Sequence, residues 1–375
     1  MKSLLILGHG QLGLMMAAEA ARLGLVVDRL DMQTGELLRG TTAQRLNIDA
    51  DALIASYDVI TAEIEHLPHS EWLDRIYASD KWANRLAFEL LPNRFSQKTL
   101  LDQLQVPTAP WCLLAERADV AQAHQQLGDA LIVKSTTGGY DGKGQWRVNP
   151  DNGEQLPEAM FGQLIAEQKI PFQREVSVIG ARDASGHCYF LPMAENVHKE
   201  GILRYSLANI AVDEALQQQA EAALASILGH LNFVGIMAME CFVTEQGLLV
   251  NELAPRVHNT GHWTQMGAVT NQFAMQVLPL VGLPLPQSQS CRATLMLNLI
   301  GCEFSPACIS LPGVSYHWYG KEVRPGRKLG HINIDATCSA ALKKAVSVLS
   351  PHLDEEHRGL LAEAVELHRQ RSINE

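Results

Sequence analysis

The chain opens with two apolar runs separated by a helical pattern. Residues 3–8 form a continuous apolar run that ends in glycine, which is typical of a buried parallel strand. Apolar residues at helical spacing follow over 11–23, and a second apolar run covers 25–30. A further short strand is expected at 58–61. These segments predict a β-α-β unit at the start of an α/β fold.

The middle of the chain is dominated by apolar runs that are typical of strands. Strands are predicted over five segments: 131–134, 175–180, 188–193, 235–243 and 247–253. Helices are predicted directly after Pro92 and over 213–229. A strand-rich tail begins with 292–301, and the last helix is predicted to end at Arg371. The pattern predicts α/β and α+β regions in one chain.

The chain is long enough for two or three domains. With 375 residues it exceeds the usual size of one hydrophobic core. The helical pattern after Pro92 places the first boundary near residue 95. Pro284 and Pro286, followed by serine and glutamine, indicate a second linker. The predicted domains are 1–95, 96–286 and 287–375.

Composition and charge exclude several classes of protein. With 47% apolar and 19% charged residues, the chain is typical of a soluble globular protein. Its net charge of −11 argues against a broad nucleic-acid-binding face, because such a face needs clustered lysine and arginine. No apolar run approaches the roughly 20 residues of a membrane span, and the N-terminal run lacks a signal-peptide pattern. The seven scattered cysteines form no CxxC pair, so a reducing compartment and a cytoplasmic location are expected.

A glycine-rich loop, GHGQLG at residues 8–13, connects the first predicted strand to the first predicted helix. This spacing lets the backbone turn tightly and offers the N–H groups of the helix N-terminus to an anion. One interpretation is a dinucleotide fold with Asp28 or Asp31 on the ribose. A second is a site for a single phosphate, which the rest of the chain favours. The third is that the glycines serve only the packing of strand against helix.

The strongest local signal is the segment IVKSTTGGYDGKGQWRV at 132–148. One strand leads to Lys134, a second strand resumes at Gln145, and four glycines lie between them with an aspartate and a lysine. So many glycines make a hairpin costly to order, which indicates that its mobility is useful. Backbone N–H groups that fold over phosphates, flanked by lysines, are typical of a nucleotide lid. The alternative is a solvated β-turn.

A second signal lies in MAMECFVTEQGLLVNE, where two alternating apolar runs flank a turn with glycine. If Thr244 pairs with Leu248, Glu240 lies directly opposite Glu252 on one face of the hairpin. Two carboxylates this close repel unless a cation lies between them, and hard oxygen ligands suit Mg²⁺ that bridges nucleotide phosphates. Asn251 points to the other face of an ideal ladder, so a role for it requires a local bulge. The alternative is an exposed hairpin with two solvated glutamates.

A strand lysine, a glycine-rich lid and an acidic hairpin together describe an ATP-grasp nucleotide site. Four segments, which include parts of these features, occur in order: KSTTGGYDGKGQ, GIMAMECFV, NELAPRVHNTGHWT and KEVRPGRKLGH. With them the chain resembles the N5-carboxyaminoimidazole ribonucleotide synthetases, the ATP-dependent carboxylating enzymes of bacterial purine biosynthesis. The resemblance extends to about residue 332. It implies a Rossmann-like pre-ATP-grasp domain, an ATP-grasp domain with a glycine-rich lid and a small strand-rich C-terminal domain.

The resemblance implies a set of contacts with MgATP. The residues implied for ATP are Arg94, Lys134, Gly139, Tyr140, Asp141, Gly142, Lys143, Gly144, Gln145, Glu167, Gln168, Lys169, Ile170, Glu175, His198, Asn251 and Glu252. Within them, 167–170 resembles the hinge that binds adenine, and Glu175 resembles the acid that binds ribose. The implied ligands of one or two Mg²⁺ ions are Glu240 and Glu252.

The resemblance also implies contacts with the ribonucleotide and a set of catalytic residues. The residues implied for substrate are Gly8, Gly10, Gln11, Leu12, Glu63, Tyr140, Arg256, Lys321 and Arg327. The residues implied for catalysis are Arg256, His258, Lys134 and Asp141. Arg256 is expected to hold bicarbonate, and His258 or Asp141 is expected to handle the proton.

The implied reaction joins bicarbonate to the exocyclic amine of aminoimidazole ribonucleotide. Bicarbonate attacks the γ-phosphate of MgATP to give carboxyphosphate and ADP, and carboxyphosphate, or CO₂ released from it, then carboxylates the amine. The expected partners are therefore aminoimidazole ribonucleotide, bicarbonate and ATP, with neither nucleic acid nor membrane. Because the family is usually dimeric, a homodimer is expected.

Three other functions stay open at this point. Another ATP-grasp ligase, such as a formate-dependent glycinamide ribonucleotide transformylase, would share the lid and the metal hairpin. A nicotinamide oxidoreductase would depend on GHGQLG alone. A binding protein without catalysis would keep the fold, but the presence of Lys134, Glu240 and Glu252 together argues against it.

Overall fold

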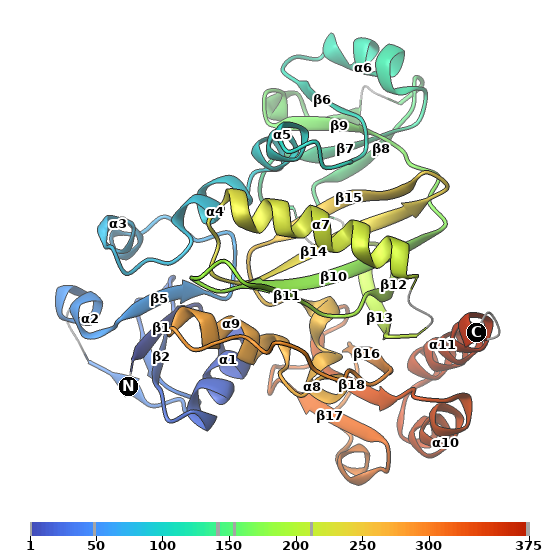
Figure 1. The fold of residues 1–375 in the computed structure, drawn as a ribbon. Coiled ribbons are helices and arrows are strands. Elements are labelled where there is room, and N and C mark those ends of the chain that lie inside the picture. Colours follow the sequence, from blue (N-terminus) through green and yellow to red (C-terminus); the bar gives the residue numbers. More distant parts are fainter. Residues whose placement is uncertain (1, 48–49, 140–142, 153–154, 211–212, 373–375) are drawn as a thin grey trace.

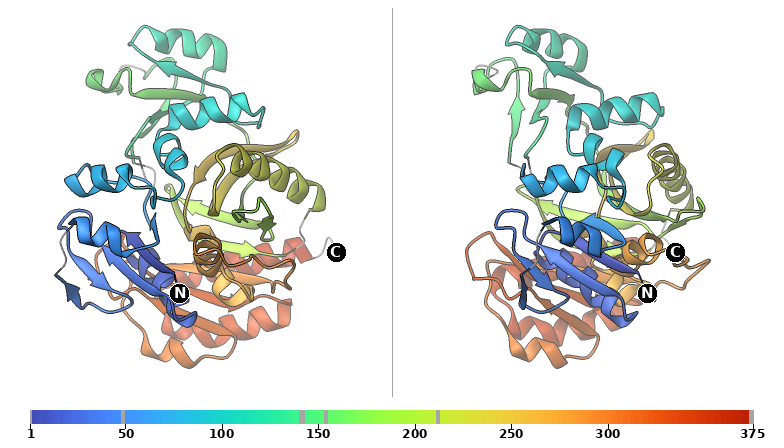
Figure 2. Two further views of the ribbon diagram at one scale, coloured as in Figure 1. Left: turned by 60° about the vertical axis from the view of Figure 1, so that its left-hand side comes forward. Right: turned by 90° about the vertical axis from the view of Figure 1, so that its left-hand side faces the viewer.

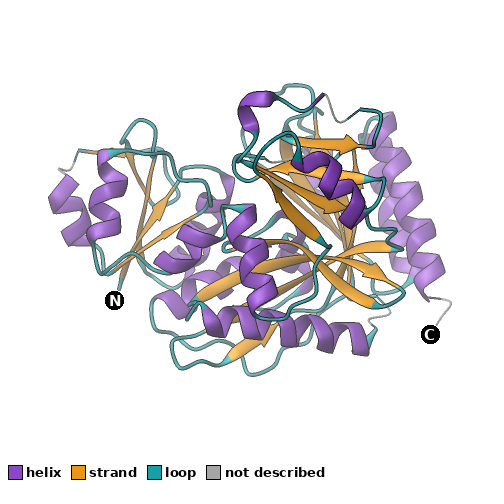
Figure 3. Ribbon diagram, turned by 90° about the horizontal axis from the view of Figure 1, so that it is seen from above, coloured by secondary structure: helices purple, strands orange, loops and turns teal. Residues whose placement is uncertain are grey.

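The computed structural model describes residues 2–47, 50–139, 143–152, 155–210 and 213–372. These residues form three β-sheets with helices around them (Figure 1). The N-terminal sheet lies beside the central sheet, and a four-stranded sheet with helix α6 lies at the other end of the molecule (Figure 2). Seen from above, helices cover the outer sides of the sheets (Figure 3). Within the described ranges, no helix has both the length and the apolar character to cross a membrane.

The N-terminal sheet has a parallel centre and an antiparallel edge. Its strands, in spatial order, are β4 (Arg45–Leu46), β3 (Leu37–Arg39), β2 (Val26–Leu30), β1 (Ser3–Leu7) and β5 (Val59–Ala62). The helices of this part of the chain are α1 (Gln11–Arg22), α2 (Ala50–Ser56), α3 (Glu71–Ala78) and α4 (Arg85–Leu90). Because β2 and β5 both pair with β1 in parallel, their carboxyl ends meet at one edge, where ligands bind in open α/β sheets. The predicted β-α-β unit is confirmed.

The four-stranded sheet is antiparallel and carries the glycine-rich segment. Its strands, in spatial order, are β6 (Trp111–Leu114), β9 (Leu164–Gln168), β7 (Leu131–Ser135) and β8 (Gln145–Val148). The helices of this part are α5 (Arg94–Gln103) and α6 (Asp119–Leu127). Lys134 pairs with Gln145, so the two predicted strands around the glycines are confirmed as a hairpin.

The central sheet has nine strands. Its strands, in spatial order, are β15 (Gly247–Ala254), β14 (Gly235–Thr244), β10 (Arg174–Arg182), β12 (Ala194–Lys199), β13 (Ile202–Ala208), β16 (Thr294–Ile300), β18 (Lys328–Asp335) and β17 (Val314–Trp318), with β11 (Cys188–Phe190) paired to β10. The helices are α7 (Glu214–His230), α8 (Thr264–Gly267), α9 (Gln272–Leu280), α10 (Ser339–Leu349) and α11 (Glu355–Ser372). Short 3-10 helices span Glu158–Met160, Asn259–Gly261, Pro306–Ser310 and Ser350–His352. Since β13 pairs with β16, the sheet continues across residue 286, and the three-domain division stays a prediction.

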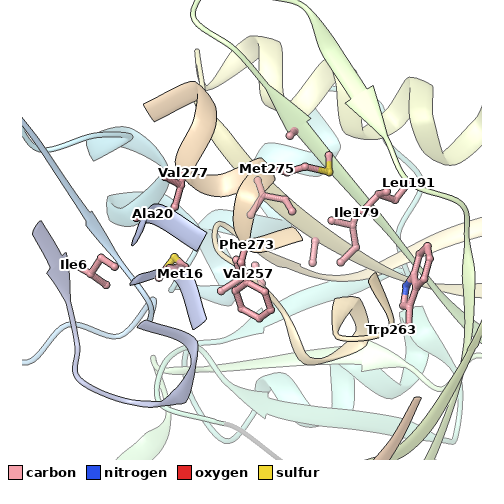
Figure 4. Close-up of a cluster of buried hydrophobic side chains, with 14 of the residues drawn as sticks. Ile6, Met16, Ala20, Ile179, Leu191, Val257, Trp263, Phe273, Met275 and Val277 are labelled. Carbon is pink, nitrogen blue, oxygen red and sulfur yellow. The ribbon is translucent and has the colours of Figure 1, made fainter. Parts of the chain in front are cut away.

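One apolar core ties the N-terminal helix to the central sheet (Figure 4). Met16 and Ala20 of α1 pack with Phe273 and Val277 of α9, and Ile179 of β10 belongs to the same cluster. All five side chains are almost fully buried. Burial of each large one stabilises the fold by roughly 1.5–3 kcal/mol. This packing fixes the glycine loop, GHGQLG at residues 8–13, which leads into α1, relative to the central sheet.

Three imidazole rings stack in the interior between the C-terminal strands and the segment after β15. The ring centroids of His262 and His331 are 4.6 Å apart, and those of His331 and His317 are 4.4 Å apart. Both nitrogens of His331 have hydrogen-bond partners, in Tyr319 and Gln265. Burial lowers the pKa of His317 to about 4 and lowers the pKa values of the other two rings well below 6.5. All three rings are therefore neutral at neutral pH.

We expect the free energy of unfolding to fall as the pH drops from about 6.5 toward about 4. In the unfolded chain these three histidines take up protons near pH 6.5, whereas in the folded state they stay neutral to a lower pH. Stability therefore falls by up to roughly 1.4 kcal/mol per pH unit for each ring, and the contribution is complete above this range. Thermal midpoints measured across the range check this. His317→Gln should have a shallower profile, and an equal slope in both proteins would contradict the assignment.

Candidate active site

The glycine loop before α1 holds a carboxylate of the protein itself. The N–H groups of Gly10 and Gly13 donate to the two oxygens of Glu63, with 2.5 Å between the nitrogen of Gly13 and Oε2. Glu63 follows β5 and is buried. A Cβ atom at Gly8 would lie 2.4 Å from Cγ of Glu63, and one at Gly10 would lie 2.8 Å from Oε1. The glycines therefore permit the close approach of Glu63, whose carboxylate takes the place that the sequence predicts for a phosphate.

The dinucleotide interpretation of this loop is not supported. Asp28 accepts a hydrogen bond from the hydroxyl of Tyr57, and Asp31 accepts from two N–H groups of its own turn. Both carboxylates are buried, so neither is available to a ribose. Arg29, between them in β2, donates to three carbonyl oxygens, including that of His9 in the glycine loop. Arg29 therefore helps to hold the glycine loop in place.

Replacing Gly8 by alanine is expected to lower the free energy of unfolding by about 3 kcal/mol. Its φ of +110° is one that other residues rarely adopt, and the new Cβ would collide with Glu63. Gly128 has a φ of +95° but open space at its Cβ position, so Gly128→Ala is the control that carries the backbone cost alone. Urea unfolding compares the two variants. Equal losses of unfolding free energy in the two variants would mean that the collision with Glu63 adds nothing to the backbone cost at Gly8.

At the four-stranded sheet, one buried glutamate is shared by two lysines. Nζ of Lys134 lies 2.7 Å from Oε2 of Glu167, and Nζ of Lys98 lies 2.8 Å from Oε1. Lys134 also donates to Oδ1 of Asn251 at 3.1 Å, so β7, β9 and β15 meet at this lysine. Burial alone would raise the pKa of Glu167, but the two ammonium groups outweigh it and hold the value at about 2. The cluster has one more positive than negative charge, which suits phosphates.

Arg94 holds the start of the glycine-rich segment. Its guanidinium donates to the carbonyl oxygens of Ser135 and Gly139 at 2.9 and 3.0 Å. A Cβ atom at Gly139 would lie 2.7 Å from the carbonyl oxygen of Lys143, so a side chain has no room there. Gly144 leads into β8 with a φ of +67°. The remaining residues predicted for this segment lie outside the described residues: Tyr140, Asp141 and Gly142.

The β14–β15 hairpin differs in register from the predicted one. Thr244 pairs with Gly247 and not with Leu248, so the predicted pairing is wrong and the turn is one residue shorter. Gly247 has a φ of +114°, in keeping with its predicted place at the turn. In this register alone, Glu240 would pair with Asn251, and the two acids would not be opposed.

A β-bulge restores the opposed acidic pair. The register shifts between Glu240 and Cys241, and Glu240 pairs with Glu252. Asn251 is the extra residue, so the bulge that the sequence requires for its role is present. Its side chain accepts the hydrogen bond from Lys134. The bulge therefore brings the acidic pair close to Lys134.

Glu240 lies among several charged groups. Its pKa is raised to about 7, mainly by burial; His198 opposes this shift, and the charges of Glu252 and Glu175 add to it. Nδ1 of His198 on β12 lies 2.9 Å from Oε2 of Glu175 on β10, so these two predicted ATP contacts lie together. Carboxylates are hard oxygen ligands, and a cation between Glu240 and Glu252 would relieve their repulsion. The donor set therefore fits Mg²⁺.

Directly after β15, Arg256 pairs with a glutamate that the sequence analysis did not single out. Its Nε and Nη2 donate to the two carboxylate oxygens of Glu65, with 2.9 Å between Nη2 and Oε1. Burial alone would raise the pKa of Glu65, but Arg256 outweighs it and holds the value at about 2. Because Glu65 follows β5, this pair joins the N-terminal sheet to the central hairpin.

His258 lies beside the acidic pair. Its Nδ1 is 3.7 Å from Oε1 of Glu240 and 3.0 Å from the hydroxyl oxygen of Thr260. Gln272 fixes the backbone here, because it accepts from the N–H of His258 and donates to its carbonyl oxygen. Burial and the charge of Arg256 lower the pKa of His258 to about 3. The ring is therefore neutral at neutral pH.

The loop between β17 and β18 contributes two cations. The ammonium of Lys321 lies over the ring of Tyr319, 5.4 Å from its centroid. Burial lowers the pKa of Lys321, with Arg327 acting in the same direction and Glu63 opposing it. The side chain of Arg327 donates to the carbonyl oxygen of Glu322 at 3.1 Å. The electrostatic influence of Glu63 on Lys321 indicates that this loop faces the glycine loop.

The other predicted contacts lie around these groups. Gln11 and Leu12 begin α1, where Leu12 packs against the core under the glycine loop. Gln168 is the last residue of β9, and Lys169 and Ile170 follow it. The N–H of Lys169 donates to a backbone carbonyl before β7. This holds the predicted adenine hinge against the four-stranded sheet.

Four residues with structural roles in the site were missed by sequence reasoning. They are Arg29, Glu65, Lys98 and Gln272. For two of them the sequence carries a signal. Glu65 is the second acid of TAEIE, at the carboxyl end of a parallel strand, and Lys98 lies one helical turn after Arg94. Nothing in the pattern around the other two points to the site.

The fold and the site define an ATP-grasp enzyme, with a strand lysine, a glycine-rich segment and an acidic hairpin that meet at one place. The family model of the ATP-grasp domain matches residues 99–273. Over 359 residues the chain is 44% identical to the N5-carboxyaminoimidazole ribonucleotide synthase of Escherichia coli (strain K12), covering 95% of this chain and 97% of that protein. The chain therefore belongs to the N5-carboxyaminoimidazole ribonucleotide synthase family, which confirms the resemblance and the expected fold class.

Two further family models match the N-terminal and C-terminal parts of the chain. The ribonucleotide synthetase preATP-grasp domain matches 1–78, and the phosphoribosylaminoimidazole carboxylase C-terminal domain matches 294–345. The crystal structure of the synthetase from Thermus thermophilus has a TM-score of 0.81 and 36% identity, covering 94% of this chain and 99% of that one. The synthase of Aspergillus clavatus in complex with ADP and 5-aminoimidazole ribonucleotide has a TM-score of 0.80 and 27% identity, covering 97% and 98%.

Proposed function

We propose that the chain catalyses the ATP- and bicarbonate-dependent carboxylation of 5-aminoimidazole ribonucleotide to N5-carboxyaminoimidazole ribonucleotide, with ADP and phosphate as the other products, in purine biosynthesis. One observation carries this proposal: the bulged end of the β14–β15 hairpin lies between two groups of residues, one around Lys134 and one around Arg256. Asn251 contacts Lys134 on the nucleotide side. Four residues after Glu252, Arg256 stands on the side of the glycine loop and Glu63. A phosphate donor and an acceptor bound to these groups would meet beside the acidic pair.

MgATP is bound by the nucleotide side of the site. Lys134, Arg94 and the glycine-rich segment hold the phosphates, while 167–170 and Glu175 hold the adenosine. Glu240 and Glu252 would hold one or two Mg²⁺ ions. When bound, the metal neutralises charge on the transferring phosphoryl group. The lysine cluster supplies further positive charge without a cofactor.

Phosphoryl transfer is the first step. An oxygen of bicarbonate attacks the γ-phosphorus of ATP. The bond between the γ-phosphorus and the bridging oxygen of the β-phosphate breaks, which gives carboxyphosphate and ADP. Arg256 holds the bicarbonate, and Lys134 and Arg94 offset the charge on the transferring group. Because water destroys carboxyphosphate, closure of the glycine-rich segment protects the intermediate.

Carboxylation of the ribonucleotide is the second step. The exocyclic amine attacks the carbon of carboxyphosphate, or of CO₂ released from it; phosphate leaves, and the amine loses one proton. Neutral His258 or Asp141 accepts this proton. Lys321 and Arg327 face the phosphate of the ribonucleotide. The relative from Aspergillus clavatus, in complex with ADP and 5-aminoimidazole ribonucleotide, supports this pair of ligands.

Phosphate release from ATP tests the proposed function. We expect it to require both bicarbonate and 5-aminoimidazole ribonucleotide, and we expect N5-carboxyaminoimidazole ribonucleotide to accumulate. Replacing bicarbonate by formate, and the acceptor by glycinamide ribonucleotide, tests the alternative ligase. Phosphate release with that second pair and not with the first would overturn the proposal.

The family resemblance also supports a homodimer in the cytoplasm. Light scattering of the purified protein measures its mass in solution, and cell fractionation of the native host locates it. A monomer at assay concentrations would contradict the first expectation, and recovery outside the cytoplasmic fraction would contradict the second.

A further inference from the structure

Arg256 is held by a carboxylate that is 191 residues distant in the chain. Its Nε and Nη2 donate to Glu65, and its Nη1 donates to the carbonyl oxygen of Val257 at 3.0 Å. Both side chains of the ion pair are mostly buried, with exposed fractions of 17% and 18%. A guanidinium with these contacts is fixed in position and in the orientation of its plane.

The same contacts leave part of the guanidinium available to a ligand. Of its five N–H groups, three donate to Glu65 and Val257 within the described part of the chain. The remaining two belong to Nη1 and Nη2, one on each nitrogen. Two such donors suit two oxygens of one planar anion. Bicarbonate is a planar anion of this kind.

Arg256 has other carboxylates within electrostatic reach. The charges of Glu252 and Glu63 both act on it, in addition to that of Glu65. Glu252 belongs to the opposed acidic pair, and Glu63 is bound to the glycine loop. A guanidinium that turned toward Glu252 would compete with a cation for this carboxylate. It would also no longer face the side of the glycine loop, where the ribonucleotide is proposed to bind.

We propose that Glu65 is a positioning residue, whose carboxylate orients Arg256 so that two of its N–H groups face bicarbonate and keeps it away from Glu252. This inference rests on the proposed function and adds to it a residue that acts through Arg256 without touching a substrate. The role requires both the negative charge of Glu65 and the length of its side chain. These two requirements can be removed one at a time.

Two variants and a matched control test this role. Glu65→Gln keeps the shape without the charge, and Glu65→Asp keeps the charge with a shorter reach. We expect kcat/KM for bicarbonate to fall by about 100-fold in the first and about 10-fold in the second, with KM for ATP changed by less than about twofold. Glu195→Gln is the control, since Glu195 forms an equally two-pronged pair with Arg371 of α11, at 2.8 Å for both contacts. It is expected to lose stability but to keep both kinetic constants.

The outcomes separate this role from the proposed function. A wild-type protein that releases no phosphate with bicarbonate and 5-aminoimidazole ribonucleotide would overturn the function. An active wild type whose Glu65→Gln variant keeps its kcat/KM for bicarbonate, or loses as much for ATP, would overturn the role of Glu65 alone. If Glu65→Gln does not fold, Glu65→Asp decides, because a loss confined to bicarbonate supports the role and unchanged kinetics overturn it.

Discussion

Replacing Arg256 by alanine is expected to reduce carboxylation by about 1,000-fold while ATP still binds. The guanidinium is proposed to hold bicarbonate, and an alanine cannot offset the charge that develops on the reacting oxygens. The contacts on the nucleotide side, such as the one between Lys134 and Asn251, come from other positions and stay intact. Phosphate release measures the rate of the reaction, and calorimetric titration with ADP measures the binding of the nucleotide.

The same substitution leaves Glu65 without its partner, so stability needs its own control. Breaking a buried ion pair lowers the free energy of unfolding, here by up to about 3 kcal/mol. A double variant, Arg256→Ala with Glu65→Gln, removes the unpaired charge and is expected to regain most of this stability but none of the activity. Arg256→Lys keeps the charge without the planar fork and should give intermediate rates. Near-normal turnover in Arg256→Ala would remove this residue from the reaction.

The strands of the site could be predicted because the burial of their residues is visible in the sequence. Residues 4–7 of β1 are fully buried in a parallel sheet. A strand that is buried on both faces needs apolar residues throughout, which explains the continuous apolar run in the sequence. In β14, Met237, Met239, Cys241 and Val243 pack in the core that includes α7, while Glu240 lies on the other face. From Met239 onward the strand alternates between buried and partly buried residues, and the alternation in the sequence follows from this difference.

The partner of a strand residue is set by turns and bulges, which the alternation does not encode. The predicted pairing of Glu240 with Glu252 is correct, but the predicted turn is wrong by one residue and a bulge compensates for it. An alternating pattern is compatible with either turn. The extra residue of the bulge, Asn251, contacts Lys134, which lies more than one hundred residues away in the chain, so the local pattern does not reveal this contact.

Contacts between distant segments account for most of what the sequence did not predict. The glycine loop has the same spacing whether a phosphate or a carboxylate approaches it, so nothing in GHGQLG indicates Glu63 as the group bound there. Lys98 occupies a helix whose pattern allows an exposed lysine, yet it is buried against Glu167. Both cases depend on charges that become partners only after the sheets have come together.

Replacing Glu252 by glutamine is expected to abolish Mg²⁺-dependent nucleotide binding and to leave the ligand-free protein at least as stable as the wild type. Without a cation, Glu252 faces Glu240 across the hairpin and contributes to the raised pKa of that residue. An amide of the same size removes this repulsion and keeps a hydrogen-bonding oxygen. As a neutral ligand it binds Mg²⁺ weakly, so turnover should fall by about 100-fold or more.

Thermal midpoints with and without ADP and Mg²⁺ separate the two effects of Glu252→Gln. The wild type should gain stability from ADP with Mg²⁺ beyond the gain from ADP alone, and the variant should show no such difference. Glu245→Gln, in the exposed turn of the same hairpin, removes one glutamate without touching the pair and should behave as the wild type. If ligand-free Glu252→Gln were less stable than the wild type, Glu252 would be stabilising the fold through its own contacts, and the opposed acids would not be a site that depends on a cation.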